Sequence, residues 1–156
     1  MITIDDTLKK LDNIPPRGQQ SIDERKFFSE ISSALFTGEL EERIADKSWV
    51  EGIILAATML DFAGKTRLIW IDNVTDLRQF KKIDKLTLEK VIEKLRDKRI
   101  ITDQQFAEIN RIRKARNEAA HDLIHQVLMS RQKQPNPKVE SDIKSAIKLL
   151  EQLFSA

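Results

Sequence analysis

The stretch "GIILAATMLDFAGKTRLIW", residues 52–70, decides the fold class. Its apolar side chains cover most of the circumference of a helix, where a surface helix would show only one stripe. A helix of this kind needs neighbours on nearly every side, so the pattern predicts the central helix of a bundle. Its longest run without a charge, "GIILAATML", is too short to cross a bilayer, which takes about 20 residues.

Polar pairs before the apolar runs predict where the surrounding helices begin. In a capping box, a Ser or Thr and a Glu or Gln three residues later bond each other's free backbone N–H groups. Such boxes are expected at Ser21–Glu24, Ser48–Glu51 and Thr102–Gln105.

The spacing of apolar residues predicts how far these helices run. The helix that opens at Ser21 is expected to end at Thr37-Gly38, and one long helix is expected from about Asp103 to Arg131. No window alternates as a strand, so the chain is expected to be all-α. The predicted architecture is a single-domain helical bundle over residues 21–156, with a short N-terminal extension over residues 1–20.

Composition limits the class of protein. Of the 156 residues, 40% are hydrophobic and 33% are charged, which is typical of a soluble globular domain. The absence of cysteine excludes disulfides, thiol catalysis and cysteine-ligated zinc. The chain opens on the polar segment "MITIDDTLKK", which does not resemble a signal peptide. We therefore expect a cytoplasmic protein with no membrane association.

Charge is distributed unevenly along the chain. Residues 1–62 carry 7 basic and 12 acidic residues, whereas residues 63–133 carry 17 basic and 10 acidic residues. A basic middle segment suits an anionic partner, although mixed surfaces of helical Lys and Glu give similar numbers.

The segment "RNEAAH", residues 116–121, is the candidate site. At about 100° per residue, Arg113, Asn117 and His121 share one polar stripe of a helix, and Arg116 lies at the border with the apolar face. Nearby positive charges disfavour a protonated imidazole, and a neutral histidine can act as a general base. Arginine can bind a phosphate and stabilise its developing charge.

These groups suit the cleavage of RNA by its own 2′-hydroxyl, which needs a base, a phosphate clamp and a general acid but no metal. The chain has only two histidines. Either His121 and His125 divide the proton transfers, or two protomers bring their helices together at a two-fold axis.

The segment "RIRKARNEAAHDL", after "LEKVIEKLRDKRIIT", resembles the signature of HEPN domains (higher eukaryotes and prokaryotes nucleotide-binding). That signature is an arginine, a polar residue directly after it, and a histidine about a turn later, on a late helix of a bundle. The resemblance is best from Leu86 to Leu123. Among HEPN domains, the segment also resembles the mannitol-repressor-like and related uncharacterised branches. The resemblance implies a metal-independent ribonuclease that acts as a homodimer, in toxin–antitoxin, anti-phage or RNA-processing systems. An antitoxin or another protein partner is therefore possible.

The resemblance assigns catalytic roles to three residues. It makes Arg116 the phosphate-binding arginine, Asn117 its polar neighbour and His121 the catalytic histidine. Our own expectation adds a set of RNA-binding residues and one auxiliary residue, and Arg113, Lys114 and His125 among them have no firm counterpart in the family. The RNA-binding residues are Arg111, Arg113 and Lys114, and the auxiliary residue is His125.

Other interpretations of these residues stay open at this point. The "RNEAAH" cluster is also compatible with an ordinary solvated helix face, or with a non-catalytic module that binds a nucleotide, RNA or a protein. "HDLIH" has metal-ligand spacing, but the chain has no second histidine pair, so we expect neither metal nor cofactor. "AGKTR", residues 63–67, lacks the first glycine of a P-loop. Trp49 and Trp70 are expected to anchor the core.

Overall fold

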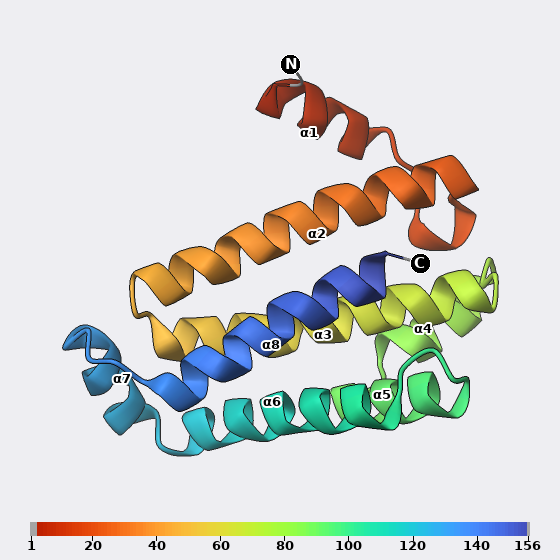
Figure 1. Ribbon diagram of the computed structural model, residues 1–156. Helices are drawn as coiled ribbons and strands as arrows, with labels where there is room; N and C mark the ends of the chain where they lie inside the picture. Colours follow the sequence, from red (N-terminus) through yellow and green to blue (C-terminus); the bar gives the residue numbers. More distant parts are fainter. Residues whose placement is uncertain (1–2, 156) are drawn as a thin grey trace.

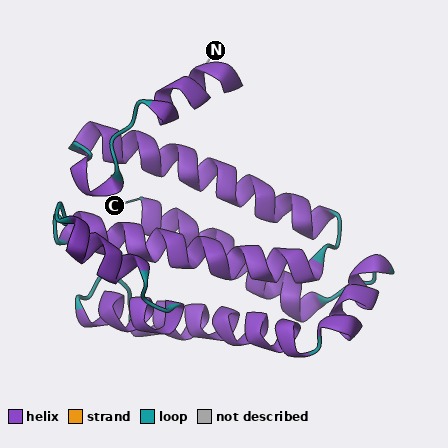
Figure 2. Cartoon of the chain, turned by 180° about the vertical axis from the view of Figure 1, so that it is seen from behind, coloured by secondary structure: helices purple, strands orange, loops and turns teal. Residues whose placement is uncertain are grey.

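The computed structural model describes residues 3–155, and every regular element in that range is helical (Figures 1 and 2). This confirms the all-α, single-domain bundle. Its elements are α1 (Ile4–Asp12), the short 3₁₀ helix η1 (Arg17–Gln19), α2 (Ile22–Ala45), α3 (Trp49–Ile71), α4 (Leu77–Asp84), α5 (Leu88–Asp97), α6 (Asp103–His121), α7 (Leu123–Arg131) and α8 (Pro137–Phe154).

Helix α3 is the centre of the bundle, as its sequence predicts. It contacts every helix from α2 to α8, and its buried residues face all of these neighbours. The expected core anchors Trp49 and Trp70 are confirmed, with 2% and 5% of their surface exposed. Gly64 lets α5 approach closely, since a Cβ there would lie 2.6 Å from a methyl group of Val91. None of the described helices has the length and apolar character of a membrane span.

The capping boxes predicted at Ser21 and Thr102 are confirmed, but helix α2 does not end where the sequence suggests. It continues through Thr37-Gly38 to Ala45 as one helix. Gly38 costs about 1 kcal/mol relative to alanine inside a helix. Downstream, Leu40 is fully buried in the core, and Arg43 makes ion pairs with two glutamates. The extra turns thus gain tertiary contacts that outweigh the local preference of glycine.

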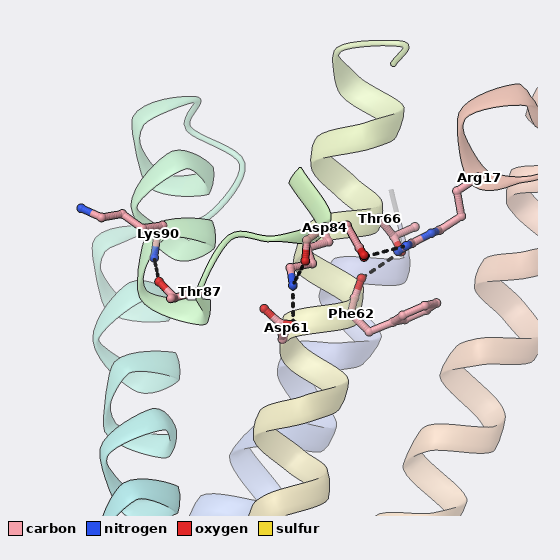
Figure 3. A network of polar contacts seen from close by, with 8 residues as sticks. Arg17, Asp61, Phe62, Thr66, Asp84, Thr87 and Lys90 are labelled. Atoms are coloured by element: carbon pink, nitrogen blue, oxygen red, sulfur yellow. Dashed lines mark hydrogen bonds and ion pairs between the residues drawn. The ribbon is translucent and has the colours of Figure 1, made fainter. Parts of the chain in front are cut away.

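Arg17 attaches the segment before α2 to the bundle (Figure 3). Its Nη1 donates a 2.8 Å hydrogen bond to Thr66 Oγ1, and its guanidinium lies 4.6 Å from the ring centre of Phe62. Burial lowers the pKa of Arg17 from its ordinary value, because desolvation outweighs the opposing effect of the Asp84 and Asp61 carboxylates. The part of the N-terminal extension that includes Arg17 therefore packs against α3.

The "AGKTR" segment lies within α3 and is helical, so it does not form a phosphate-binding loop. The Lys65 ammonium is mostly buried, forms a 2.9 Å ion pair with Asp61 and donates a 2.8 Å hydrogen bond to the Asp84 carbonyl. These contacts satisfy the cation within the bundle and hold the end of α4 against α3.

Helix α1 lies outside the core. None of its residues is buried, and its apolar residues Ile4 and Leu8 are 80% and 53% exposed. Figure 1 shows α1 standing away from the layer formed by α3 and α8. Helix α1 thus adds nothing to the core, although the Lys10 Nζ lies 5.5 Å from the ring centre of Phe27 on α2, while Arg17 packs directly against α3.

Candidate functional site

Helix α6 carries the residues of the "RNEAAH" cluster. Its start is fixed by the Thr102–Gln105 capping box, and its core face by Ile109 and Ile112, which are 1% and 0% exposed. These contacts set the rotation of the helix. They leave Asn117 and His121 exposed and Arg116 half-buried at the border of the apolar face, as the spacing predicts.

Arg116 and Asn117 are in direct contact. The Arg116 Nη2 donates a 3.3 Å hydrogen bond to the Asn117 Oδ1. A guanidinium has five N–H groups, so this contact orients the arginine and still leaves donors for a phosphate. Asn117 can therefore position the Arg116 guanidinium without contacting a substrate itself.

His121 is the last residue of α6. The helix ends because Asp122 adopts φ −112° and ψ 45°, outside the helical region, while its N–H still bonds the Glu118 carbonyl at 3.0 Å. The long helix expected from Asp103 to Arg131 is therefore wrong, since α7 begins anew at Leu123. His121 is exposed, and Figure 1 shows the turn from α6 to α7 at one end of the bundle.

Tertiary contacts explain why the helix breaks there. Helix α7 turns back against the start of α3, where the Ser130 Oγ accepts a 3.4 Å hydrogen bond from the Val50 N–H. Just beyond α7, the Gln134 carbonyl accepts a 2.7 Å bond from the Trp49 Nε1. A straight continuation of α6 would place both acceptors away from α3.

The capping box predicted at Ser48 is wrong. The Ser48 side chain makes no capping hydrogen bond, and Glu51 forms an ion pair with Arg43 instead. Ser130, far away in the sequence, bonds a free N–H at the start of α3.

His125 lies on α7, on a different helix from His121. It is exposed. Because the helix breaks at Asp122, His125 does not lie on a continuation of α6. The two histidines are therefore carried by separate helices, and an auxiliary role for His125 stays a prediction.

The three expected RNA-binding residues differ in their surroundings. The Arg111 Nε makes a 2.8 Å hydrogen-bonded ion pair with Asp142 of α8. Arg113 donates a 3.0 Å bond to Asn110 and lies 4.0 Å from the carboxylate of Glu89. Lys114 is exposed on the side of α6 that faces away from the core. Two of the three cations thus hold α6 to its neighbours, and Lys114 is the one most open to a ligand.

Asp142, the ion-pair partner of Arg111, is not among the residues predicted from the sequence. It is 2% exposed, and its Oδ2 has no hydrogen-bond partner among the described residues. A signal was present, since Val139, Asp142 and Ile143 follow the helical spacing of the buried face of α8. A cavity of about 180 Å³ lies between α6, α7 and α8, and residues such as Glu118, Gln126 and Asp142 line it.

Helix α7 exposes apolar side chains beside His121. We call them the α7 apolar patch, which consists of Leu123 (48% exposed), Ile124 (80%), Val127 (38%) and Leu128 (52%). No residue of α7 is buried. Adjacent exposed apolar residues of this kind are typical of surfaces that contact another protein.

Within residues 3–155, no three His, Asp or Glu side chains are grouped as metal ligands would be. The "HDLIH" spacing no longer places both histidines on one helix, because α6 ends at His121.

The fold and this candidate site define an all-α bundle whose helix α6 ends in an Arg-Asn-His cluster, with Asn117 and His121 exposed and Arg116 half-buried. Residues 71–156, more than half of the chain, match the family model described as "Domain of unknown function (DUF4145)". The chain therefore belongs to this family, whose matched region includes α4 to α8 and the whole cluster. Comparisons with curated proteins and with solved structures find no match.

Proposed function

We propose that this protein is a metal-independent endoribonuclease of the HEPN type that acts as a homodimer. The observation that supports it best is the exposure of His121 together with the Arg116–Asn117 contact, at the end of one helix. The resemblance of the "RNEAAH" cluster to the HEPN signature gives these residues their roles.

In the proposed reaction, the imidazole of His121 removes the proton of an RNA 2′-hydroxyl. The 2′-oxygen attacks the adjacent phosphorus, the bond to the 5′-oxygen breaks, and the leaving oxygen takes up a proton. The products are a 2′,3′-cyclic phosphate and a 5′-hydroxyl end. Arg116 binds the phosphate oxygens and stabilises the charge of the transition state, and Asn117 holds Arg116 in place.

The position of the two residues on α6 favours a site shared by two chains. Arg116 and His121 are five residues apart, which separates them by about 140° around a helix. No hydrogen bond or ion pair joins them within the described part of the chain. In a homodimer, the His121 of each protomer approaches the Arg116 of the other, and the α7 apolar patch beside His121 is the proposed contact surface.

Incubation of the purified protein with end-labelled RNA in EDTA tests this proposal. We expect cleavage that leaves 2′,3′-cyclic phosphate ends, and we expect Arg116→Ala and His121→Ala to abolish it while the helical content is kept. Gln104→Ala, at an exposed residue near the start of the same helix, is the control and should cut RNA at the parent rate. If either motif variant cut RNA at the parent rate, the proposal would fail.

A second candidate function is a binding or regulatory module on the same scaffold. It is favoured by the ion pairs of Arg111 and Arg113, which leave few cations of α6 open to RNA. Such a protein would not cleave RNA in EDTA, but it would still shift RNA in a gel or form a dimer. That outcome would replace the first proposal.

A further inference from the structure

A second cavity lies at the opposite end of the bundle from His121. Its volume is about 490 Å³, and it lies between the start of α2, the end of α3 and the end of α8. Figure 1 shows these three helix ends close to each other and far from α7. Trp70 and Val50 are 20 residues apart on α3, which corresponds to about 30 Å along the helix. The cavity is therefore separate from the proposed cleavage site.

Among the residues that the structure describes, cations outnumber anions around this cavity. Arg25, Lys26 and Arg67 line it, and Glu30 is the carboxylate that lines it with them. The remaining lining is largely apolar and includes Ile22, Ile71 and Phe154. A volume of 490 Å³ lies within the range of small-molecule sites, roughly 300–1,000 Å³. The cavity thus combines positive charge with an apolar wall.

Arg25 is held in a fixed position at this cavity. Its Nη1 donates a 3.2 Å hydrogen bond to the Trp70 carbonyl, and its Nη2 donates a 3.2 Å bond to the Asn73 Oδ1. Its guanidinium also lies 5.8 Å from the ring centre of Trp70. The Nε of Arg25 is buried and has no hydrogen-bond partner among residues 3–155. Each Nη carries a second N–H group beyond these bonds, so the oriented guanidinium keeps donors for an anion and binds it with little loss of entropy.

Arg67 adds a second cation in a poorly hydrated environment. It lies on α3 one turn before Trp70 and Ile71, and burial lowers its pKa from the ordinary value because desolvation disfavours the charged guanidinium. A charge that has lost part of its hydration interacts more strongly with an anion than an exposed one does.

We propose that this cavity binds a small amphipathic anion, with its carboxylate or phosphate between Arg25 and Arg67 and its apolar body against Ile22 and Phe154. The proposal does not depend on RNA cleavage. It assigns to this chain a second site, whose ligand is recognised by one negative group attached to an apolar group.

The test uses 1-anilinonaphthalene-8-sulfonate, an anionic aromatic probe that fluoresces in apolar surroundings. We expect the full chain to bind it saturably at one site, and Arg25→Gln and Arg67→Gln each to weaken binding about tenfold, as expected for a lost charge-assisted hydrogen bond. Arg131→Gln, on α7 at the other end of the bundle, is the matched control and leaves the affinity unchanged. Octanoate or octyl phosphate should displace the probe, and the stronger competitor identifies the preferred anion.

Several results would overturn the proposal. One is a probe affinity that both arginine variants retain, and another is the absence of saturable binding to the parent chain. Displacement by octanol as effective as displacement by octanoate would show that only apolar contact matters. If an arginine variant fails to fold, Lys26→Gln replaces it, because Lys26 is exposed and its loss should still weaken binding.

Discussion

The Arg111 Nε donates a 2.8 Å hydrogen bond to the Oδ1 of Asp142, a residue with only 2% of its surface exposed. This pair joins α6, which carries the proposed catalytic residues, to α8. The carboxylate is buried while the guanidinium is half-exposed, so the pair is asymmetric. Removal of the arginine leaves a buried charge without a partner, which costs more than the pair itself contributes.

We therefore predict that Arg111→Ala lowers the free energy of unfolding by about 2–3 kcal/mol. Chemical denaturation measures the change, and Lys114→Ala, on the same helix but exposed, is the control with little expected effect. Addition of Asp142→Asn to Arg111→Ala should recover stability, since the buried charge is then absent. A cost for Arg111→Ala no larger than that for Lys114→Ala would contradict the structural role of the pair.

The cap at the start of α3 gives a second prediction. Because the Ser130 Oγ, and not Ser48, bonds the Val50 N–H, Ser130→Ala should destabilise the bundle by about 1 kcal/mol. Ser48→Ala should cost clearly less. Thermal unfolding of the two variants in parallel measures the difference, and a larger effect at Ser48 would restore the local capping box predicted from the sequence.

The helix ends and the core show which parts of the fold could be predicted from the sequence. Local signals were sufficient where both partners lie within one turn, as at Thr102–Gln105, or where a segment is apolar on all sides, as in α3. They failed where a distant contact decides. The burial of Leu40 in the core stabilises α2 beyond Gly38, and the hydrogen bond of Ser130 with Val50 holds α7 against α3. Both contacts join residues far apart in the sequence, so no local pattern predicts them.

The candidate site was predictable to a similar extent. The border position of Arg116 and the exposure of His121 follow from helical spacing. The Asp142 partner of Arg111 lies 31 residues away, so spacing within α6 cannot find it. The break at Asp122, which places His125 on another helix, results from contacts of α7 with α3.

Salt dependence tests which cations of α6 contact RNA. Lys114 is exposed, whereas Arg113 is largely covered and bonded to Asn110. We expect Lys114→Gln to reduce the slope of log affinity against log salt by roughly 0.7 for single-stranded RNA, the value for one lost phosphate contact. Arg113→Gln should change the slope little. Filter binding at several salt concentrations measures both, and equal changes would contradict the assignment of separate roles.

The α7 apolar patch is predicted to join two protomers. Ile124 is 80% exposed, so Ile124→Glu should leave the fold of a monomer intact while it places a charge in the contact surface. Sedimentation velocity should show a dimer for the parent chain and a monomer for the variant. Leu77→Glu, at a residue that is 65% exposed on α4, is the matched control and should remain dimeric. An Ile124→Glu variant that stays dimeric would exclude the patch as the interface.

A mixing experiment separates a shared catalytic site from one within a single chain. Arg116→Ala and His121→Ala are each expected to be inactive alone. If each site takes Arg116 from one protomer and His121 from the other, a mixed dimer of the two variants contains one intact site and one that lacks both groups. Random exchange of equal amounts should then restore about a quarter of the parent activity. A site formed within one chain predicts no recovery, because every chain in the mixture lacks one group. Recovery on mixing, and its loss when Ile124→Glu is added to both variants, would tie the reaction to the contact between α7 helices.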